Sequence, residues 1–119
     1  KYKIVERFGS NLGSDINYNM KGGYKKFKFP FTNIYLIHWK PQTITPIHPH
    51  PNIECSFMVL KGELEENIYH KMNTDGYYMV NKKILKQYQC SHINDLIGEH
   101  SVKNLYDTHA CSLHYYKQI

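Results

Sequence analysis

Long hydrophobic runs are absent from this chain of 119 residues. No stretch approaches the roughly 20 consecutive apolar residues that a helix needs to cross a membrane, so the sequence predicts no membrane association. Apolar residues still make up 41% of the chain, a share that is ordinary for a globular protein. A chain of this length is expected to form one domain.

Arginine is nearly absent as well, since a single Arg7 stands against fourteen lysines. The net charge is +5 and the isoelectric point is about 9.0. Nucleic-acid sites usually depend on the planar guanidinium fork of arginine, which pairs with phosphates and with guanine. The excess of lysine therefore indicates a solvated basic surface, and we expect no nucleic-acid partner.

Cysteine is scarce, with three in the chain: Cys55, Cys90 and Cys111. So small and odd a number argues against a disulfide scaffold. Reduced thiols are typical of the cell interior, so the sequence predicts a cytoplasmic protein. No segment resembles a signal peptide, but the chain starts at Lys1 rather than at methionine, so that absence carries little weight.

Short β-type segments fill the chain from residue 33 onward. Residues 33–39 (NIYLIHW) are a β-branched and aromatic run. We expect further strands at 43–50, in 55–72 around a turn at Lys61–Gly62, in 76–89 around a turn at Asn81–Lys82, and at 109–118. Short strands that recur about every 8 to 12 residues predict an all-β sandwich or barrel.

The first 32 residues have a mixed composition with two expected loops, SNLGSDIN and MKGGYKKF. Only residues around 10–20 could form a short helix. We expect residues 1–32 to form an N-terminal extension that packs on the barrel, and residues 33–119 to form the barrel itself.

The stretch HPHPNIEC (48–55) contains a candidate metal site. His48 and His50 are two residues apart on an extended segment, so both side chains point to one face. Two imidazoles on one face of a strand can chelate a metal ion. Pro46, Pro49 and Pro51 restrict this segment to an edge, a bulge or a rim.

Two further candidates end the same stretch, Glu54 and Cys55. Cys55 alternates with Phe57 and Val59 in the apolar set of the following strand. Because neighbouring residues on a strand face opposite ways, we expect Cys55 to point inward and Glu54 outward.

The order of the motifs resembles the cupin superfamily. The His48–His50 pair is followed by Gly62 at a strand turn, and the segment 93–104 (INDLIGEHSVKN) then supplies His100 and Asn104. The resemblance covers roughly residues 33–117. It implies a cupin double-stranded β-helix, a small β-barrel or jelly-roll, with a metal in its mouth and a short N-terminal extension.

Three features narrow the resemblance to the cysteine dioxygenase, or thiol dioxygenase, branch of the cupins. Cys55 stands where most cupins have a glutamate ligand, five residues after the second histidine. The segment 93–104 is similar to the family pattern INDxIGxHxVxN, and SLHxY is present at 112–116. Trp39 also aligns upstream.

This resemblance implies that His48, His50 and His100 hold an iron(II) ion, although other divalent metals also accept imidazole. It implies an iron-dependent dioxygenase whose partners are a small thiol, such as cysteine, and O2. The expected product is a sulfinic acid.

The resemblance also implies a hydrogen-bond relay of Ser112, His114 and Tyr116, in which His114 orients the Tyr116 hydroxyl. The three share one parity on the last strand, so all can face the cavity. Some members of the family carry a thioether cross-link between a cysteine and a tyrosine, which corresponds here to Cys55 and Tyr116.

Substrate binding is where the chain departs from the family. Its members place an arginine just after a tyrosine to clamp the substrate carboxylate, and the nearest match is Tyr24 with Lys26, reached across a two-residue gap. Lysine offers a point charge instead of a bidentate fork. We expect Tyr24, Lys26 and Trp39 to bind substrate; a surface role for Lys26 and a core role for Trp39 are the alternatives.

Two other functions stay open at this point. The same three histidines could support a cupin of different chemistry, or the chain could be a non-catalytic module that binds a metal or a ligand.

Overall fold

The computed structural model describes residues 16–17 and 23–118, and every regular element within these ranges is a β-strand. The strands are β1 (Ile16–Asn17), β2 (Tyr24–Lys28), β3 (Ile34–Trp39), β4 (Thr43–Ile44), β5 (Ile53–Lys61), β6 (Leu64–Lys71), β7 (Tyr77–Leu85), β8 (Cys90–Ile93), β9 (Glu99–Asn104) and β10 (Ala110–Gln118). The all-β prediction is confirmed. The short helix considered near residues 10–20 lies mostly outside the described residues. Within the described part of the chain, no helical segment has the length and apolar character of a membrane span.

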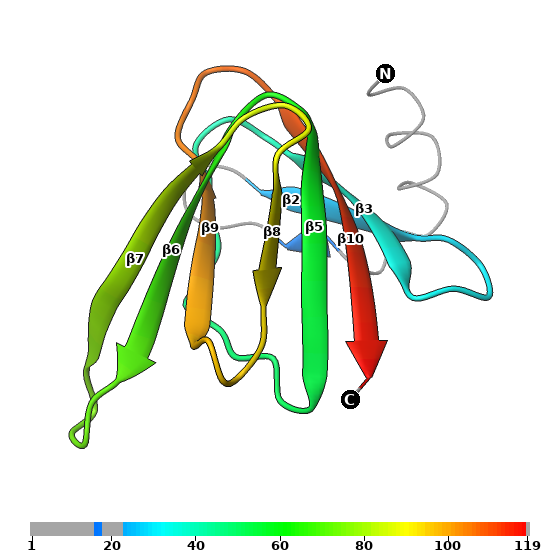
Figure 1. The fold of residues 1–119 in the computed structure, drawn as a ribbon. Coiled ribbons are helices and arrows are strands. Elements are labelled where there is room, and N and C mark those ends of the chain that lie inside the picture. Colours follow the sequence, from blue (N-terminus) through cyan, green and yellow to red (C-terminus); the bar gives the residue numbers. More distant parts are fainter. Residues whose placement is uncertain (1–15, 18–22, 119) are drawn as a thin grey trace.

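Two antiparallel sheets make up the fold (Figure 1). The larger sheet has six strands in the order β1-β2-β3-β10-β5-β8, and the smaller has four in the order β4-β9-β6-β7. One apolar cluster contains residues from both sheets, among them Trp39 and Val59 of the larger sheet and Leu64 and Val102 of the smaller. The core therefore lies between the sheets.

Strand β5 shows how the residue pattern builds this core. Cys55, Phe57 and Val59 are at most 2% exposed, whereas Ser56 between them is exposed. Burying an apolar side chain of this size contributes about 1.5–3 kcal/mol to stability. The predicted inward face of this strand is confirmed.

The turn at Lys61–Gly62 is present, but the strands that it joins do not form the expected hairpin. β5 pairs with β10 and β8, whereas β6 pairs with β7 and β9, so the chain crosses from one sheet to the other at Gly62. Gly62 has a φ of 79°, and a Cβ atom there would lie 3.0 Å from the Cβ atom of Ala110. Glycine suits both the left-handed backbone and the close contact.

The expected turn at Asn81–Lys82 is wrong. Residues 77–85 form one continuous strand, β7, in which Asn81 pairs with Ile68 and Lys82 with Asn67 of β6. A shift in register next to Ile68 leaves Val80 as an extra residue, so β7 continues through a β-bulge. Pairing along all of β6 overrides a local turn signal that contains neither glycine nor proline.

Two features position the segment that carries the first two histidines. β4 is an edge strand that ends at Ile44, so only the start of the strand expected at 43–50 is present; the prolines lie beyond it, where they have no N–H for pairing. Beyond it, His48 and His100 exchange two backbone hydrogen bonds, of 3.0 and 3.1 Å. Gly98 lets β9 approach β6 closely, because a Cβ atom there would lie 2.6 Å from the carbonyl oxygen of Tyr69.

Part of the predicted N-terminal extension belongs to the larger sheet. β2 (Tyr24–Lys28) pairs along β3, opposite residues 35–39. Most of residues 1–22 lies outside the described residues, and the division of the chain at residue 33 stays a prediction.

Candidate metal centre

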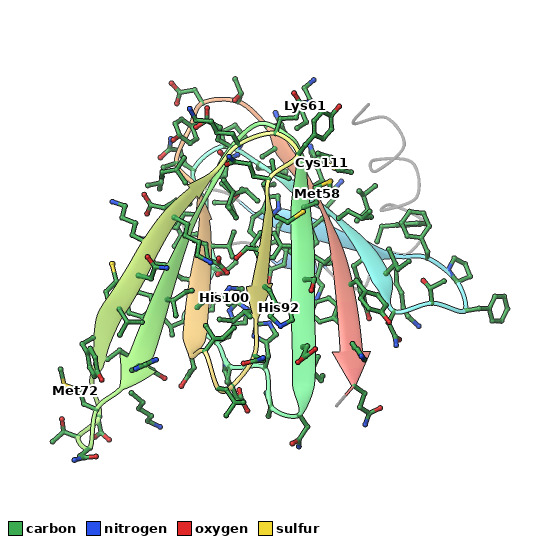
Figure 2. All side chains as sticks on the ribbon, in the orientation of Figure 1. Met58, Lys61, Met72, His92, His100 and Cys111 are labelled. Carbon is green, nitrogen blue, oxygen red and sulfur yellow. The ribbon has the colours of Figure 1, made fainter. Side chains whose placement is uncertain are left out.

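Three histidines meet between the sheets. His48 and His50 come from the connection between β4 and β5, and His100 comes from β9. One ring nitrogen from each lies within 4.8 Å of the other two. His50 and His100 are buried and His48 is half-buried. Figure 2 shows His100 in the interior of the molecule.

The hydrogen bonds of two of these rings indicate where their lone pairs point. Nδ1 of His48 lies 2.9 Å from the carbonyl oxygen of Pro46, and Nδ1 of His100 lies 2.7 Å from the carboxylate of Glu66. A carbonyl and a carboxylate only accept hydrogen bonds, so each Nδ1 carries a hydrogen in the neutral, metal-binding form of the ring. Each Nε2 then presents a lone pair.

These two Nε2 atoms are 3.0 Å apart. Nitrogens at that distance share a hydrogen or a metal ion between them, because two facing lone pairs alone would repel each other. Two nitrogens that bind one ion with bonds of about 2.0–2.1 Å lie at most about 4.2 Å apart. The His48–His100 pair therefore fits a shared metal ion.

Burial keeps His48 and His50 in the form that binds a metal. Burial and the neighbouring imidazoles lower the pKa of His50 to about 3, and burial lowers the pKa of His48. Neutral imidazole is the ligand form. Nδ1 of His50 is buried and has no hydrogen-bond partner among the described residues, while its backbone N–H donates to Asp95 at 3.2 Å. The three rings fit a divalent first-row metal, and imidazole alone does not select which one.

Glu66 was not predicted from the sequence, yet it is the carboxylate that contacts His100. It lies on β6, is fully buried, and also accepts a short hydrogen bond from the hydroxyl of Ser91. Burial raises the pKa of Glu66, but hydrogen bonds from His100 and Ser91 outweigh burial and hold the pKa below its usual value. The sequence did indicate that Glu66 points inward, because it alternates with Leu64 and Ile68 on the same face of the strand.

Cys55 and Tyr116 face the three histidines from the larger sheet. They are directly opposite each other on β5 and β10, and their side chains are hydrogen bonded. Burial raises the pKa of the Cys55 thiol to about 12 and also raises the pKa of Tyr116. Both groups are therefore neutral near pH 7.

Ser112 and His114 continue this group along β10. The indole nitrogen of Trp39 donates to the hydroxyl of Ser112 at 2.8 Å, and that hydroxyl lies 2.7 Å from Nε2 of His114. Nδ1 of His114 lies 3.9 Å from the sulfur of Cys55. The predicted relay residues come together: the rings of His114 and Tyr116 are nearly parallel with centres 6.3 Å apart, and the nitrogen of His114 on the other side from Ser112 faces Cys55.

A small inner cavity of about 60 Å³ joins the two groups. Its lining contains all three predicted substrate residues, Tyr24, Lys26 and Trp39. His48, His100, Cys55, His114 and Tyr116 line it as well. Trp39 is also part of the core, since it is 2% exposed and its ring is 5.2 Å from that of Tyr24. Trp39 thus lines the cavity, as its predicted substrate role requires, and also belongs to the core.

Lys26 lines both the inner cavity and a larger outer pocket. The outer pocket has a volume of about 410 Å³, and Lys26 and Tyr116 line both spaces. The ammonium group of Lys26 lies 4.9 Å from the ring centre of Tyr35 and 5.6 Å from that of Tyr116, within range of cation–π attraction. The lysine is half-buried and directed at the cavity rather than free on the surface.

Glu54 takes no part in this site. Its carboxylate lies on the other face of β5, 4.0 Å from the ring of His92, which is labelled in Figure 2. The predicted outward direction of Glu54 is confirmed. The arrangement as a whole offers three imidazole nitrogens to a cation, beside a cavity that is lined by a thiol, a phenol and one cationic side chain.

Comparison with known sequences supports one family. The family described as "Cysteine dioxygenase type I" matches residues 28–118. The human protein named "Cysteine dioxygenase type 1" is 36% identical over 87 residues, which cover 71% of this chain and 44% of the human protein. The chain thus spans less than half the length of this relative.

Comparison with solved structures supports the fold. The cupin domain of Drosophila melanogaster CENP-C aligns with a TM-score of 0.61 at 12% identity, over 86% of this chain and 74% of that one. An oxalate oxidase aligns with a TM-score of 0.57 at 20% identity, over 80% of this chain and 42% of that one. The two-sheet architecture is that of the cupins.

Proposed function

The chain belongs to the cysteine dioxygenase type I family, and we propose that it is an iron(II)-dependent thiol dioxygenase. It converts cysteine or a related small thiol into the sulfinic acid, with both atoms of O2 added to the sulfur. One observation supports this most directly: two histidines of the three-histidine cluster, His48 and His100, line the same small cavity as the Cys55–Tyr116 pair.

The proposed metal ligands are His48, His50 and His100. When bound there, iron(II) would supply the redox chemistry that joins O2 to a thiol. Three neutral imidazoles leave the positive charge of a divalent ion uncompensated, so an anionic thiolate is attracted to the site. A glutamate in place of Cys55 would cancel part of that charge, whereas the neutral thiol does not.

Lys26 is proposed to bind the carboxylate of the substrate. Lys26 lines both the inner cavity and the outer pocket, so a thiol held at the histidines can direct a carboxylate toward its ammonium group. Because lysine provides a point charge, the carboxylate is attracted but only loosely oriented. Tyr24 and Trp39 form the wall beside it.

Tyr116, His114 and Ser112 are proposed to direct protons and hydrogen bonds on the opposite side. The phenol of Tyr116 stays neutral because burial raises its pKa, so it can donate a hydrogen bond to substrate oxygen. Trp39 and Ser112 hold the ring of His114 next to Cys55.

A thioether between Cys55 and Tyr116 is the second part of the proposal. It would join the sulfur to a ring carbon, with loss of one hydrogen from the thiol and one from the ring, and O2 would take up both hydrogens. The direct pairing of the two residues across β5 and β10 supports it. Mass spectrometry of iron-loaded, oxygen-exposed protein should show the loss of two hydrogens. Cys111→Ser should keep the loss and Cys55→Ala should abolish it; an unchanged wild-type mass contradicts the cross-link.

The dioxygenase proposal is tested by oxygen uptake with iron-loaded protein and a panel of small thiols. We expect iron to bind, uptake to depend on the thiol, and the sulfinic acid to accumulate in step with the O2 consumed. His92→Gln, at a surface histidine away from the cavity, should behave as the wild type does. Iron that binds without thiol-dependent uptake would favour a cupin of different chemistry, and failure to bind any metal would favour a non-catalytic module.

A further inference from the structure

One polar side chain from each of four consecutive strands forms a closed cluster behind the metal centre. Glu66 comes from β6, Lys83 from β7, Ser91 from β8 and His100 from β9. One carboxylate oxygen of Glu66 bonds Nδ1 of His100 at 2.7 Å. The other accepts from Ser91 and lies 3.8 Å from the ammonium group of Lys83, which in turn donates to Ser91 at 3.3 Å.

Burying the carboxylate of Glu66 reduces the stability of the fold unless partners compensate for the lost hydration. Moving a carboxylate from water into a protein interior costs several kcal/mol, and partners must offset that cost. Both oxygens of Glu66 are held, and the side chain is fully buried although Lys83 beside it remains partly exposed. A hydrophobic residue would fill the same inward position, next to Leu64 and Ile68, without any such requirement.

We propose that Glu66 is a positioning residue for the metal centre: its carboxylate keeps the hydrogen of His100 on Nδ1, directs Nε2 at the metal, and adds negative charge without occupying a coordination position. The proposal rests on the three-histidine site and not on thiol oxidation. Ser91 and Lys83 hold the carboxylate in the orientation that this contact requires.

The physical reason is the electronic connection through the imidazole ring. A carboxylate that accepts from one ring nitrogen makes the other nitrogen a stronger donor to a metal, and it fixes the tautomer and the plane of the ring. In this chain Cys55 stands where a cupin carboxylate ligand would bring a negative charge. Glu66 supplies such a charge one ring further from the metal, which leaves the cavity side open.

Glu65 is a matched control, because it is the adjacent residue with the same charge. It points to the opposite face of β6, where its carboxylate pairs with Lys82 at 3.4 Å and Lys103 at 3.8 Å and accepts from Asn67 at 2.9 Å. Glu65 therefore has comparable polar partners but no contact with a histidine of the site.

The affinity of the metal-free protein for Zn²⁺ and Co²⁺, measured in competition with a chelator, tests the proposal without thiol or O2. Removal of such an outer carboxylate typically weakens metal binding about 10- to 100-fold. We expect that loss in Glu66→Gln, a partial recovery in Glu66→Asp, and an affinity within about twofold of wild type in Glu65→Gln. Wild-type affinity in Glu66→Gln, or an equal loss in Glu65→Gln, overturns the proposal.

A second measurement needs no variant and so does not depend on how the substitutions fold. Nitrogen-15 NMR of the metal-free wild-type protein should show His100 with its hydrogen on Nδ1. A His100 ring with its hydrogen on Nε2 overturns the proposal. Because neither experiment involves turnover, an enzyme that binds metal but does not oxidise thiols leaves this inference standing and contradicts only the proposed function.

Discussion

The two sides of the inner cavity present opposite hydrogen-bonding character. On the side of the smaller sheet, His48 and His100 use their Nδ1 hydrogens elsewhere and turn lone pairs toward each other. On the side of the larger sheet, burial keeps the Cys55 thiol and the Tyr116 phenol protonated. One side is built to hold a cation, and the other to offer hydrogens to what binds beside it.

This difference separates metal binding from the treatment of substrate. Substitutions on the histidine side should remove the metal and everything that depends on it. Substitutions on the side of Cys55 and Tyr116 should leave the metal in place and change only the reaction. The four predictions below test that separation.

Loss of one imidazole should have the largest effect. In His48→Ala, two imidazoles remain and the metal is expected to be lost on dialysis, with thiol-dependent oxygen uptake below detection. Metal analysis and oxygen uptake on the same sample check this. His48 is half-buried in a connection, so the fold should survive, and His92→Ala is the control. Full metal content in His48→Ala would remove His48 from the ligand set.

Loss of the phenol should reduce turnover with the metal retained. In Tyr116→Phe we expect kcat to fall about 100-fold, since a positioned acid or hydrogen-bond donor typically contributes a factor of that order. Tyr115→Phe, on the exposed face of the same strand, should retain wild-type kcat. Metal content should equal wild type in both; a loss of iron in Tyr116→Phe alone would show that the two sides are not independent.

Low pH should lower the free energy of unfolding of the metal-free protein through one histidine on each side of the cavity. The pKa of His50 is lowered to about 3 and that of His114 well below its usual value, in each case chiefly by burial. In the unfolded chain each histidine binds a proton near pH 6.5, so the unfolded state binds more protons and stability falls as the pH drops below about 6.5.

Urea unfolding of chelator-treated protein at pH 7 and pH 5 measures this effect. We expect a loss of about 1–2 kcal/mol for each of these two histidines over that interval. His114→Gln should have a shallower pH dependence than the wild type. Equal stability at both pH values would mean that these rings are not held neutral in the fold.

Removal of the positive charge of Lys26 should have the smallest effect on the reaction. In Lys26→Met we expect KM for a carboxylate-bearing thiol to rise about 10-fold, the lower end of the range for a hydrogen bond to a charged group, with kcat little changed. A thiol that lacks a carboxylate should be insensitive to the change. Lys25→Met, on the other face of β2, is the control; an equal rise in KM for both thiols would contradict the carboxylate role.

Local alternation was sufficient to predict much of the site. The spacing of His48 and His50, and the parity of Cys55 against Glu54, depend only on successive side chains facing opposite ways along an extended chain. The structure agrees with both. The family motifs then brought His100, His114 and Tyr116 to the same cavity without any knowledge of the strand order.

Which strands pair with each other was harder to predict from the sequence. The turn at Gly62 was recognised from its glycine, but nothing local indicates that β5 and β6 enter different sheets. The turn expected at Asn81 failed because the whole of β6 lies beside it and supplies hydrogen bonds through the bulge. These outcomes depend on which strands are neighbours, a non-local property.

The site residues thus fall into two groups: those that local sequence patterns position, and those that contacts between distant strands position. Side-chain chemistry and period-two alternation were enough for the histidine pair and the inward cysteine, because each depends on a few consecutive residues. The contact of Glu66 with His100, supported by Lys83 and Ser91, and the position of His114 beside Cys55 arise only when β5 to β10 are packed together. A buried charge is stabilised by partners from distant strands, so its place and its partners belong to the tertiary structure.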